Sequence, residues 1–389
     1  MSEKELTSEE VKKFEKEHVM QSYGRFGIVI EKGKGYYVYD KEGKKYLDFI
    51  GGLATCSVGH GNSEVAKAVY LQAKKLAGVS NLYYMEPQAI LAKKLSELSG
   101  LKKCFFCNSG AEANEAAIKL AKKFTGKKEF IAFKNSFHGR TTGSLAATWK
   151  VKYREAFTPL APDVHFVAYD DINAFKEMIN ERTAGIIIEP IQGEAGIIVP
   201  KPGFLKKIKE VCEEKKILMI VDEVQTGCGR TGSFFEYQNE GVLPDIVTTA
   251  KGLANGIPIG VCLSNLEFDK GDHGSTFGGN NISCAAAIAT IDFIEKNSLM
   301  KNASETGDYF MQRLTELSKR KKIIKEVRGK GLIVGVELNE DKAKEIVNKA
   351  LLAGLLCNAA AENVIRFLPP LIITKKEVDK AVRILKKIM

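Results

Sequence analysis

The sequence lacks the features of membrane-spanning and exported proteins. None of its apolar runs approaches the roughly 18 to 20 residues that a spanning helix needs. The first ten residues, Met1–Glu10, are too charged for a signal peptide. From these two features we expect a cytoplasmic protein with no membrane partner.

Cysteine and histidine are also too few and too scattered to form a metal or disulfide framework. The eight cysteines show no framework spacing, and the chain has only five histidines. Cys104 and Cys107 form a single C-x-x-C pair without a second pair to complete a zinc site, so we expect no metal. Free buried thiols are the interpretation we adopt, and a redox pair is the alternative.

The formal charge of +10 is spread along helix-like stretches instead of being gathered in one patch. Even the densest basic run, residues 319–322, lacks the interleaved aromatic residues of a nucleic-acid-binding module. We therefore expect no nucleic-acid partner, although a basic nucleic-acid-binding protein is the alternative from another class. The positive charge would attract small anionic substrates.

Two strand ends carry the chemistry that the sequence suggests most strongly. An apolar run, residues 217–221, ends at Asp222, and a second run, 245–249, leads to Lys251 before a glycine-rich loop. Ligands bind at the carboxyl ends of strands in open α/β sheets. A partly desolvated lysine has a lowered pKa and a nucleophilic amine, so this pair suits pyridoxal phosphate: Lys251 for its aldehyde and Asp222 for its ring nitrogen. Taken alone, Lys251 could equally be one of many surface cations, since Lys and Arg total 58.

Three further segments could complete such a site. At residues 108–111 a strand passes into an alanine-rich helix, a geometry that can hold a phosphate but that an ordinary capped helix also shares. Phe137 offers a flat face for a ring, and Arg140 offers a fork for a carboxylate, with His138 more typical of a structural residue. A buried strand delivers Glu189, and Glu194 lies in the loop that follows it.

The remaining pattern predicts elements without visible chemistry. We expect a helix from Ser63, which we assign as its cap, and a final helix capped by Thr374. The other expected elements are helices at 8–14, 87–98, 283–295, 304–317 and 342–353, a hairpin within 35–49, and strands within 327–337 and from 364.

Taken together, these segments resemble the class III pyridoxal-phosphate aminotransferases, in the family's order, from Gly35 to the C-terminus. The motifs that carry the resemblance are NSGAEANE (108–115), FHGRT (137–141), EPIQGE (189–194), DEVQTG (222–227), TAKG (249–252), STFGGN (275–280) and RFLPP (366–370).

The resemblance implies a role for each matching residue. Lys251 and Asp222 are the implied catalytic residues, and Lys251 also moves the proton between substrate and cofactor. The implied pyridoxal 5'-phosphate-binding set is Ser109, Gly110, Ala111, Phe137, Asp222, Glu223, Val224, Gln225, Lys251 and, from the partner subunit, Thr276. The implied substrate-binding set is Arg140, Glu194, Ser275 and Arg366. Arg140 would take the carboxylate of an acylated donor, and Arg366 that of glutamate.

The resemblance also implies a fold and an assembly. The fold is α/β, that of the type I pyridoxal-phosphate-dependent transferases, with a mostly parallel seven-stranded sheet in a large domain and a smaller α+β domain. We expect an N-terminal arm at 1–50 that contributes to the small domain, the large domain at 51–280 and the small domain at 281–389. A homodimer with shared active sites is implied.

The implied reaction transfers the terminal amine of N2-acetylornithine to 2-oxoglutarate, giving a semialdehyde and glutamate, as in arginine biosynthesis. Ornithine, 4-aminobutyrate, succinylornithine and carrier-linked lysine are alternative donors, and an aminomutase is a further rival. Two departures from the family bear on this choice. Ala111 stands where threonine is frequent, and Gly59–Ser63 replaces a Gly-His-x-His-Pro segment, which leaves the donor open.

Overall fold

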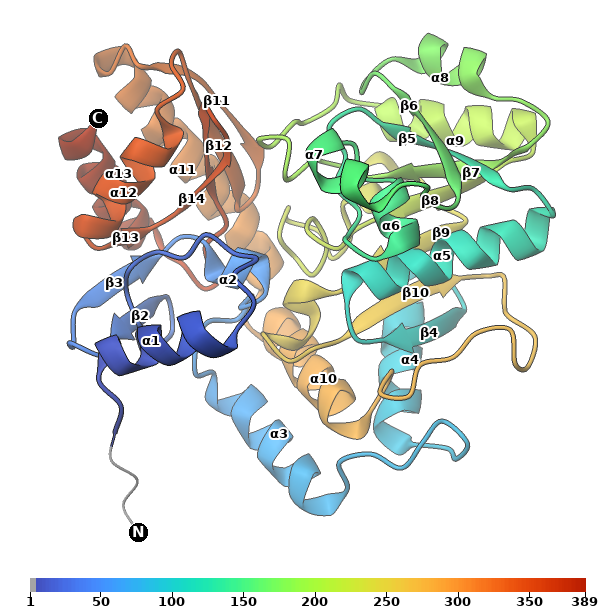
Figure 1. Cartoon of the computed structure of the whole chain (residues 1–389), viewed down its shortest axis with the longest axis horizontal. Coiled ribbons are helices and arrows are strands. Elements are labelled where there is room, and N and C mark those ends of the chain that lie inside the picture. Colours follow the sequence, from blue (N-terminus) through green and yellow to red (C-terminus); the bar gives the residue numbers. More distant parts are fainter. Residues whose placement is uncertain (1–4) are drawn as a thin grey trace.

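The computed structural model describes residues 5–389, which form two parts (Figure 1). One part is built on a seven-stranded sheet from the middle of the chain. The other brings the blue N-terminal segment beside the orange and red C-terminal segment, so residues far apart in sequence share one body (Figure 1).

The large sheet has the strand order β4-β10-β9-β8-β7-β5-β6. Only β10 runs antiparallel to its neighbours, β4 and β9, and the other pairs are parallel. This confirms the predicted mostly parallel seven-stranded sheet. The strands are β4 (Lys103–Cys107), β5 (Glu129–Phe133), β6 (Asp163–Val167), β7 (Thr183–Ile188), β8 (Leu218–Asp222), β9 (Ile246–Thr249) and β10 (Gly260–Ser264).

Helices cover both faces of this sheet, which explains why its strands read as continuous apolar runs. Side chains alternate between the faces: Ile220 packs in the cluster that includes α5, whereas its neighbour Val221 packs with α4, α9 and α10. The helices of this part are α3 (Ser63–Lys75), α4 (Glu86–Ser99), α5 (Gly110–Thr125), α6 (Thr142–Ala146), α7 (Val151–Arg154), α8 (Ile172–Met178), α9 (Phe204–Lys215) and α10 (Asn281–Lys296), with 3-10 turns η1 (Glu155–Phe157), η2 (Glu236–Glu240) and η3 (Lys251–Ala254).

Two four-stranded sheets form the second part. One, β11-β12-β15-β14, is antiparallel. The other, β1-β2-β3-β13, joins the two ends of the chain because β13 pairs in parallel with β3. The strands are β1 (Ile30–Lys34), β2 (Tyr37–Asp40), β3 (Lys45–Asp48), β11 (Ile324–Lys330), β12 (Ile333–Leu338), β13 (Leu355–Leu356), β14 (Asn358–Ala361) and β15 (Val364–Phe367). The helices are α1 (Ser8–His18), α2 (Gly51–Ala54), α11 (Leu299–Arg320), α12 (Ala343–Leu352) and α13 (Lys375–Ile388).

The expected helices, hairpin and strands are all present, but two caps differ in detail. The cap of α3 is Asn62, not Ser63, because the Asn62 side chain accepts from the backbone N–H of Glu64 and Val65. Thr374 occupies the cap position of α13, yet its hydroxyl donates to the Glu377 carboxylate instead of accepting from the helix backbone. Within residues 5–389, no helix combines the length and apolar character needed to cross a bilayer.

Candidate active site

A cavity of about 430 Å³ opens where β8 and β9 end and α5 begins. Parallel strands place their carboxyl ends at one edge, which is where α/β sheets bind ligands. The predicted site residues that line this cavity are Ser109, Gly110, Ala111, Phe137, Arg140, Glu194, Asp222, Val224, Gln225 and Lys251. The structure thus gathers ten predicted residues from five separate segments.

Lys251 enters the cavity directly after β9, on backbone with a positive φ of 42°. A non-glycine residue rarely adopts this conformation, and such strain is concentrated at functional sites. Burial lowers the pKa of Lys251, against the opposing effects of the nearby Glu194 and Asp222 carboxylates. The result is an amine that loses its proton more readily than an exposed lysine.

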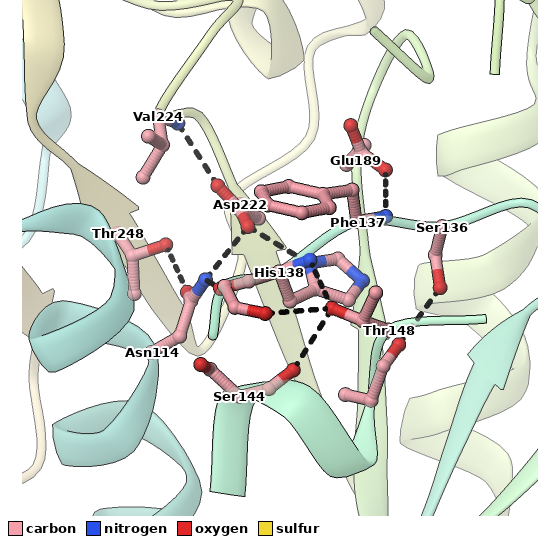
Figure 2. Close-up of polar contacts among 12 residues, drawn as sticks. Asn114, Ser136, Phe137, His138, Ser144, Thr148, Glu189, Asp222, Val224 and Thr248 are labelled. Atoms are coloured by element: carbon pink, nitrogen blue, oxygen red, sulfur yellow. Dashed lines mark hydrogen bonds and ion pairs between the residues drawn. The ribbon is translucent and has the colours of Figure 1, made fainter. Parts of the chain in front are cut away.

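Asp222 ends β8 and is held by a buried set of donors (Figure 2). Its Oδ2 accepts from Asn114 Nδ2 and lies 2.8 Å from His138 Nδ1, and its Oδ1 accepts from the backbone N–H of Val224. Asn114 is fixed in turn because its Oδ1 accepts from the Thr248 hydroxyl. These donors fix the orientation of the buried carboxylate, which suits it to pair with a ring nitrogen.

The start of α5 offers the cavity an anion-binding end. Ser109 is the cap, and its hydroxyl accepts from the Glu112 N–H at 3.2 Å. A Cβ on Gly110 would lie 2.7 Å from Val224 Cγ1, so only glycine allows the helix to begin this close to the β8 loop. Free N–H groups and the helix dipole at this end are suited to a phosphate.

Arg366 and Glu194 form an ion pair at the edge of the cavity. Arg366 Nη1 donates to Glu194 Oε1 at 2.6 Å and also lies within bonding distance of Gln225 Oε1 and the Gly193 carbonyl. The Arg366 side chain is only 1% exposed, against 36% for Glu194. Burial alone would raise the pKa of Glu194, but the charge and hydrogen bond of Arg366 outweigh it and lower that pKa.

Arg140 occupies a more open position than Arg366. Its guanidinium lies 3.5 Å over the ring of Tyr153 and 5.7 Å from the centre of the Phe137 ring. It forms no ion pair with the residues that the structure describes. A cation stacked on an aromatic ring keeps its donors free, so Arg140 can take a carboxylate from a ligand.

Four predicted residues do not line the cavity: Arg366, which contacts it through Glu194 and Gln225, and Glu223, Ser275 and Thr276, which lie outside it. Glu223 points its side chain into the protein, away from the cavity, where its carboxylate accepts from the Thr226 hydroxyl and the Tyr237 N–H. Ser275 bonds Asn108 and Gly278, and Thr276 lines a separate cavity of about 620 Å³.

The sequence interpretation missed Asn114, Thr248 and Tyr153, all of which support the site. Asn114 carried a signal, because it interrupts the apolar face of an alanine-rich helix and is fully enclosed. A buried polar side chain needs partners, and here they are Asp222 and Thr248.

The cysteine pair does not contribute to this chemistry. Cys104 and Cys107 lie on β4 as expected, and burial raises the pKa of each thiol to about 12. A thiol with so high a pKa is a poor nucleophile. Within the described residues no cluster of His, Cys, Asp and Glu side chains could hold a metal.

The cavity residues fit pyridoxal phosphate in each of its parts. The α5 end suits the phosphate, Asp222 suits the ring nitrogen, the face of Phe137 suits the ring, and the Lys251 amine suits the aldehyde. Ala111 lines the same cavity, and its side chain carries no hydroxyl.

Comparisons with known proteins agree with this geometry. The family model described as class-III aminotransferase matches residues 19–389. Acetylornithine aminotransferases of Archaeoglobus fulgidus and Methanocaldococcus jannaschii are each 47% identical, over 95% and 96% of this chain and 98% and 96% of theirs.

Solved structures of aminotransferases have the same fold over nearly the whole of this chain. An ornithine aminotransferase of Toxoplasma gondii, described with partial occupancy of pyridoxal phosphate at its active site, has a TM-score of 0.94 at 33% identity. The alignment covers 98% of this chain and 94% of that one. An acetylornithine aminotransferase of Elizabethkingia anophelis has a TM-score of 0.89 at 35% identity, covering 98% of both chains.

Proposed function

This chain belongs to the class III aminotransferases, and from that premise we propose that it moves the terminal amine of N2-acetyl-L-ornithine to 2-oxoglutarate. The products are N-acetyl-L-glutamate 5-semialdehyde and L-glutamate. The observation that carries the reaction class is one cavity holding the desolvated Lys251 amine beside the Arg366–Glu194 ion pair. The near-full-length likeness to acetylornithine aminotransferases supports the donor.

Pyridoxal phosphate, when bound, supplies an aldehyde that condenses with amines and a ring that withdraws electrons from the substrate carbon. The residues that would hold it are Asp222, Phe137, Gln225 and the backbone of residues 109–111. Asp222 would keep a proton on the ring nitrogen through its carboxylate. Val224 would limit how deeply the ring sits, because its side chain fills the space beside Gly110.

Lys251 Nζ is the group placed to move a proton. Burial lowers its pKa, so the neutral amine forms more readily than on an exposed lysine, and a neutral amine can take a proton from the substrate carbon. The same amine could deliver that proton to the carbon of the bound cofactor, because it is the terminal atom of a flexible four-carbon side chain.

Each of the two arginines would bind the carboxylate of a different substrate. Arg366 would bind the α-carboxylate of glutamate as a two-pronged pair, and Arg140 would bind the carboxylate at the far end of the amine donor. Glu194 would neutralise Arg366 whenever the donor presents only methylene groups there. An unpaired buried guanidinium would otherwise cost several kcal/mol.

We infer a cytoplasmic homodimer that shares its active sites. Thr276 lines a cavity beside residues 77–81, and the neighbouring side chains of Tyr84 and Phe277 are exposed in the isolated chain. A second copy seated there would cover these rings and receive the Thr276 hydroxyl at its phosphate site. We propose an arm at 1–50, a large domain at 51–280 and a small domain at 281–389. The β3–β13 pairing links the arm to the C-terminal part, whereas α10, the first element of the proposed small domain, packs against α3 and α4 of the large part.

A panel of amine donors with 2-oxoglutarate tests the proposal. N2-acetylornithine should give the highest kcat/KM, and Lys251→Ala should remove activity with every donor. Ornithine is the second candidate, because the Toxoplasma gondii ornithine aminotransferase has nearly the same fold. Preference for ornithine, 4-aminobutyrate, succinylornithine or a carrier-linked lysine would reject N2-acetylornithine as the donor but would still support transamination. Absence of transamination with all of them would reject both.

A further inference from the structure

Two arginines lie in one row across the C-terminal sheet. In the pairing of β11, β12 and β15, Arg328 lies opposite Gly335, and Gly335 lies opposite Arg366. Paired residues on neighbouring strands point to the same face. The side chains of Arg328 and Arg366 therefore leave the sheet on one side, with a gap between them where Gly335 has no side chain.

The loop that carries Glu194 fills this gap. It is closed at its base by two backbone hydrogen bonds between Gln192 and Ile198, of 3.0 and 3.1 Å. A Cβ on Gly335 would lie 3.0 Å from Ile197 Cβ and 3.1 Å from the Gly196 carbonyl oxygen. The glycine is what allows the loop to approach the sheet this closely.

Arg328 binds the far side of this loop. Its Nε donates to the carbonyls of Gly196 and Ile197 at 3.1 and 2.9 Å, and its Nη2 donates to Gly196 at 2.9 Å. Its Nη1 is occupied by Glu337 and by Glu326. The guanidinium thus ties the loop backbone to carboxylates of the sheet.

The loop backbone at these carbonyls is strained, so it needs such support. Ile197 is fully buried and has a φ of 59°, and Gly196 has a φ of 100°. A β-branched residue with positive φ is an outlier that persists only where its surroundings hold it. Because Arg328 satisfies the two carbonyls that flank the Ile197 Cα, those of Gly196 and Ile197, it is well placed to hold this conformation.

We propose that Arg328 is a positioning residue that fixes the Glu194 loop, so that the Glu194 carboxylate stays aligned with Arg366. This rests on the proposed function, in which Glu194 neutralises Arg366 while the amine donor is bound. Arg328 does not contact the cavity, and it acts only through the loop backbone. Loss of the clamp should therefore weaken the donor half of the reaction and spare the glutamate half, in which Arg366 must be free.

Amide hydrogen exchange of the holoenzyme tests the clamp without depending on any substrate. Arg328→Met keeps the stem but removes the donors, and Glu337 stays paired with Lys325 at 2.6 Å. Peptides covering 193–198 should exchange at least about tenfold faster, with 218–222 unchanged. Glu326→Gln is the matched control, because Glu326 binds Arg328 but not the loop, and it should behave as wild type. Unchanged exchange at 193–198 in Arg328→Met would overturn the proposal.

Single-turnover spectra of the two half-reactions test whether loss of the clamp affects the amine donor more than glutamate. In Arg328→Met the rate with the amine donor should fall roughly tenfold, while the rate with glutamate should change by less than about twofold. Gly335→Ala displaces the loop without changing either arginine. It should likewise lower the rate with the amine donor relative to the rate with glutamate. Equal losses in both halves would mean a merely structural role and reject the proposal. If wild type itself fails to transaminate, the proposed function fails, and the exchange result still decides whether the clamp exists.

Discussion

His138 Nδ1 lies 2.8 Å from Asp222 Oδ2, and both side chains are almost fully buried. An ionised carboxylate can only accept, so the imidazole proton of this pair lies on Nδ1. Asn114 donates to the same carboxylate oxygen at 2.8 Å. Asp222 is therefore oriented by its neighbours before any ligand arrives, as a group that must hold a ring nitrogen requires.

Replacing this carboxylate by an amide should be far more damaging than its size suggests. In Asp222→Asn the new NH2 group faces donors, and the negative charge that would hold the ring proton is gone. We expect turnover to fall at least about 100-fold, a loss typical of removing one preorganised electrostatic group. The measurement is the single-turnover rate with saturating cofactor.

Asp245→Asn is the control for Asp222→Asn. The Asp245 carboxylate accepts from Lys209 and the Met219 N–H at the opposite ends of β8 and β9. The Asp245→Asn substitution should lower thermal stability and leave turnover within about threefold of wild type. A turnover of Asp222→Asn close to that of this control would contradict the assigned role.

The lowered pKa of Lys251 predicts how the apoprotein takes up its cofactor. Burial lowers this pKa below the ordinary 10.5, and an amine reacts with an aldehyde only when neutral. The rate of covalent uptake should therefore rise with pH to a midpoint below 10.5, followed as visible absorbance. Lys251→Ala should bind the cofactor without this absorbance. A midpoint at or above 10.5 would show that the cavity does not tune the amine.

Subunit mixing tests the shared active site. Lys251→Ala removes the amine from its own cavity, and Thr276→Ala removes the hydroxyl that we propose the partner receives. A mixed dimer would hold one site that lacks both groups and one site that is intact. Activity should thus return to about a quarter of wild type under random exchange. Confirmed exchange with no recovery would show that Thr276 serves its own chain.

Glu223 predicts a pH dependence of stability that is separate from catalysis. Burial raises its pKa to about 7 from 4.5, although the Thr226 hydroxyl and the Tyr237 N–H oppose the shift. Between these values the folded state binds more protons than the unfolded state, so this group's stabilisation is complete below pH 4.5 and is lost as pH rises through 7.

Glu223→Gln should remove that dependence. The amide oxygen can accept from Tyr237 and the NH2 can donate to the Thr226 hydroxyl, so the contacts survive. The variant should gain up to about 3 kcal/mol of unfolding free energy relative to wild type above pH 7, with no gain at pH 4.5. Denaturant titrations at several pH values measure the unfolding free energy of both proteins. If that free energy depends on pH in the same way for wild type and Glu223→Gln, the raised pKa of Glu223 is contradicted.

The strand-end chemistry was predictable because it depends on local sequence. A buried apolar run followed by one polar residue places that residue at a sheet edge, which located Asp222 and Lys251. The cap of α3 was misassigned because Asn62 and Ser63 are both good caps, and only the backbone conformation decides between them.

Contacts between distant segments could not be predicted in this way. Glu223 follows Asp222 directly, but alternation sends its side chain into the protein, away from the cavity. Asn114 acquires its role only when α5 packs against β8 and β9. Likewise the row of Arg328, Gly335 and Arg366 depends on strand register, which no single segment encodes.

The ion pair between Glu194 and Arg366 predicts that the two halves of the reaction respond differently to one substitution. The amine donor brings uncharged methylene groups to Arg366, so Glu194 must remain paired there. Glutamate and 2-oxoglutarate bring a carboxylate, so Glu194 must swing away, and its 36% exposure beside a second cavity leaves room for that movement.

Glu194→Ala should therefore slow the half-reaction with the amine donor by about 10- to 100-fold, because the buried guanidinium loses its counter-charge. The half-reaction with glutamate should be unchanged or faster, since the substrate no longer displaces a competing carboxylate. Single-turnover spectra measure each half separately. Glu362→Ala is the control, because Glu362 lines the same second cavity without contacting Arg366, and both halves should stay near wild type. Equal losses in both halves of Glu194→Ala would reject the switch, because a residue needed only for folding or cofactor binding cannot tell the two substrates apart.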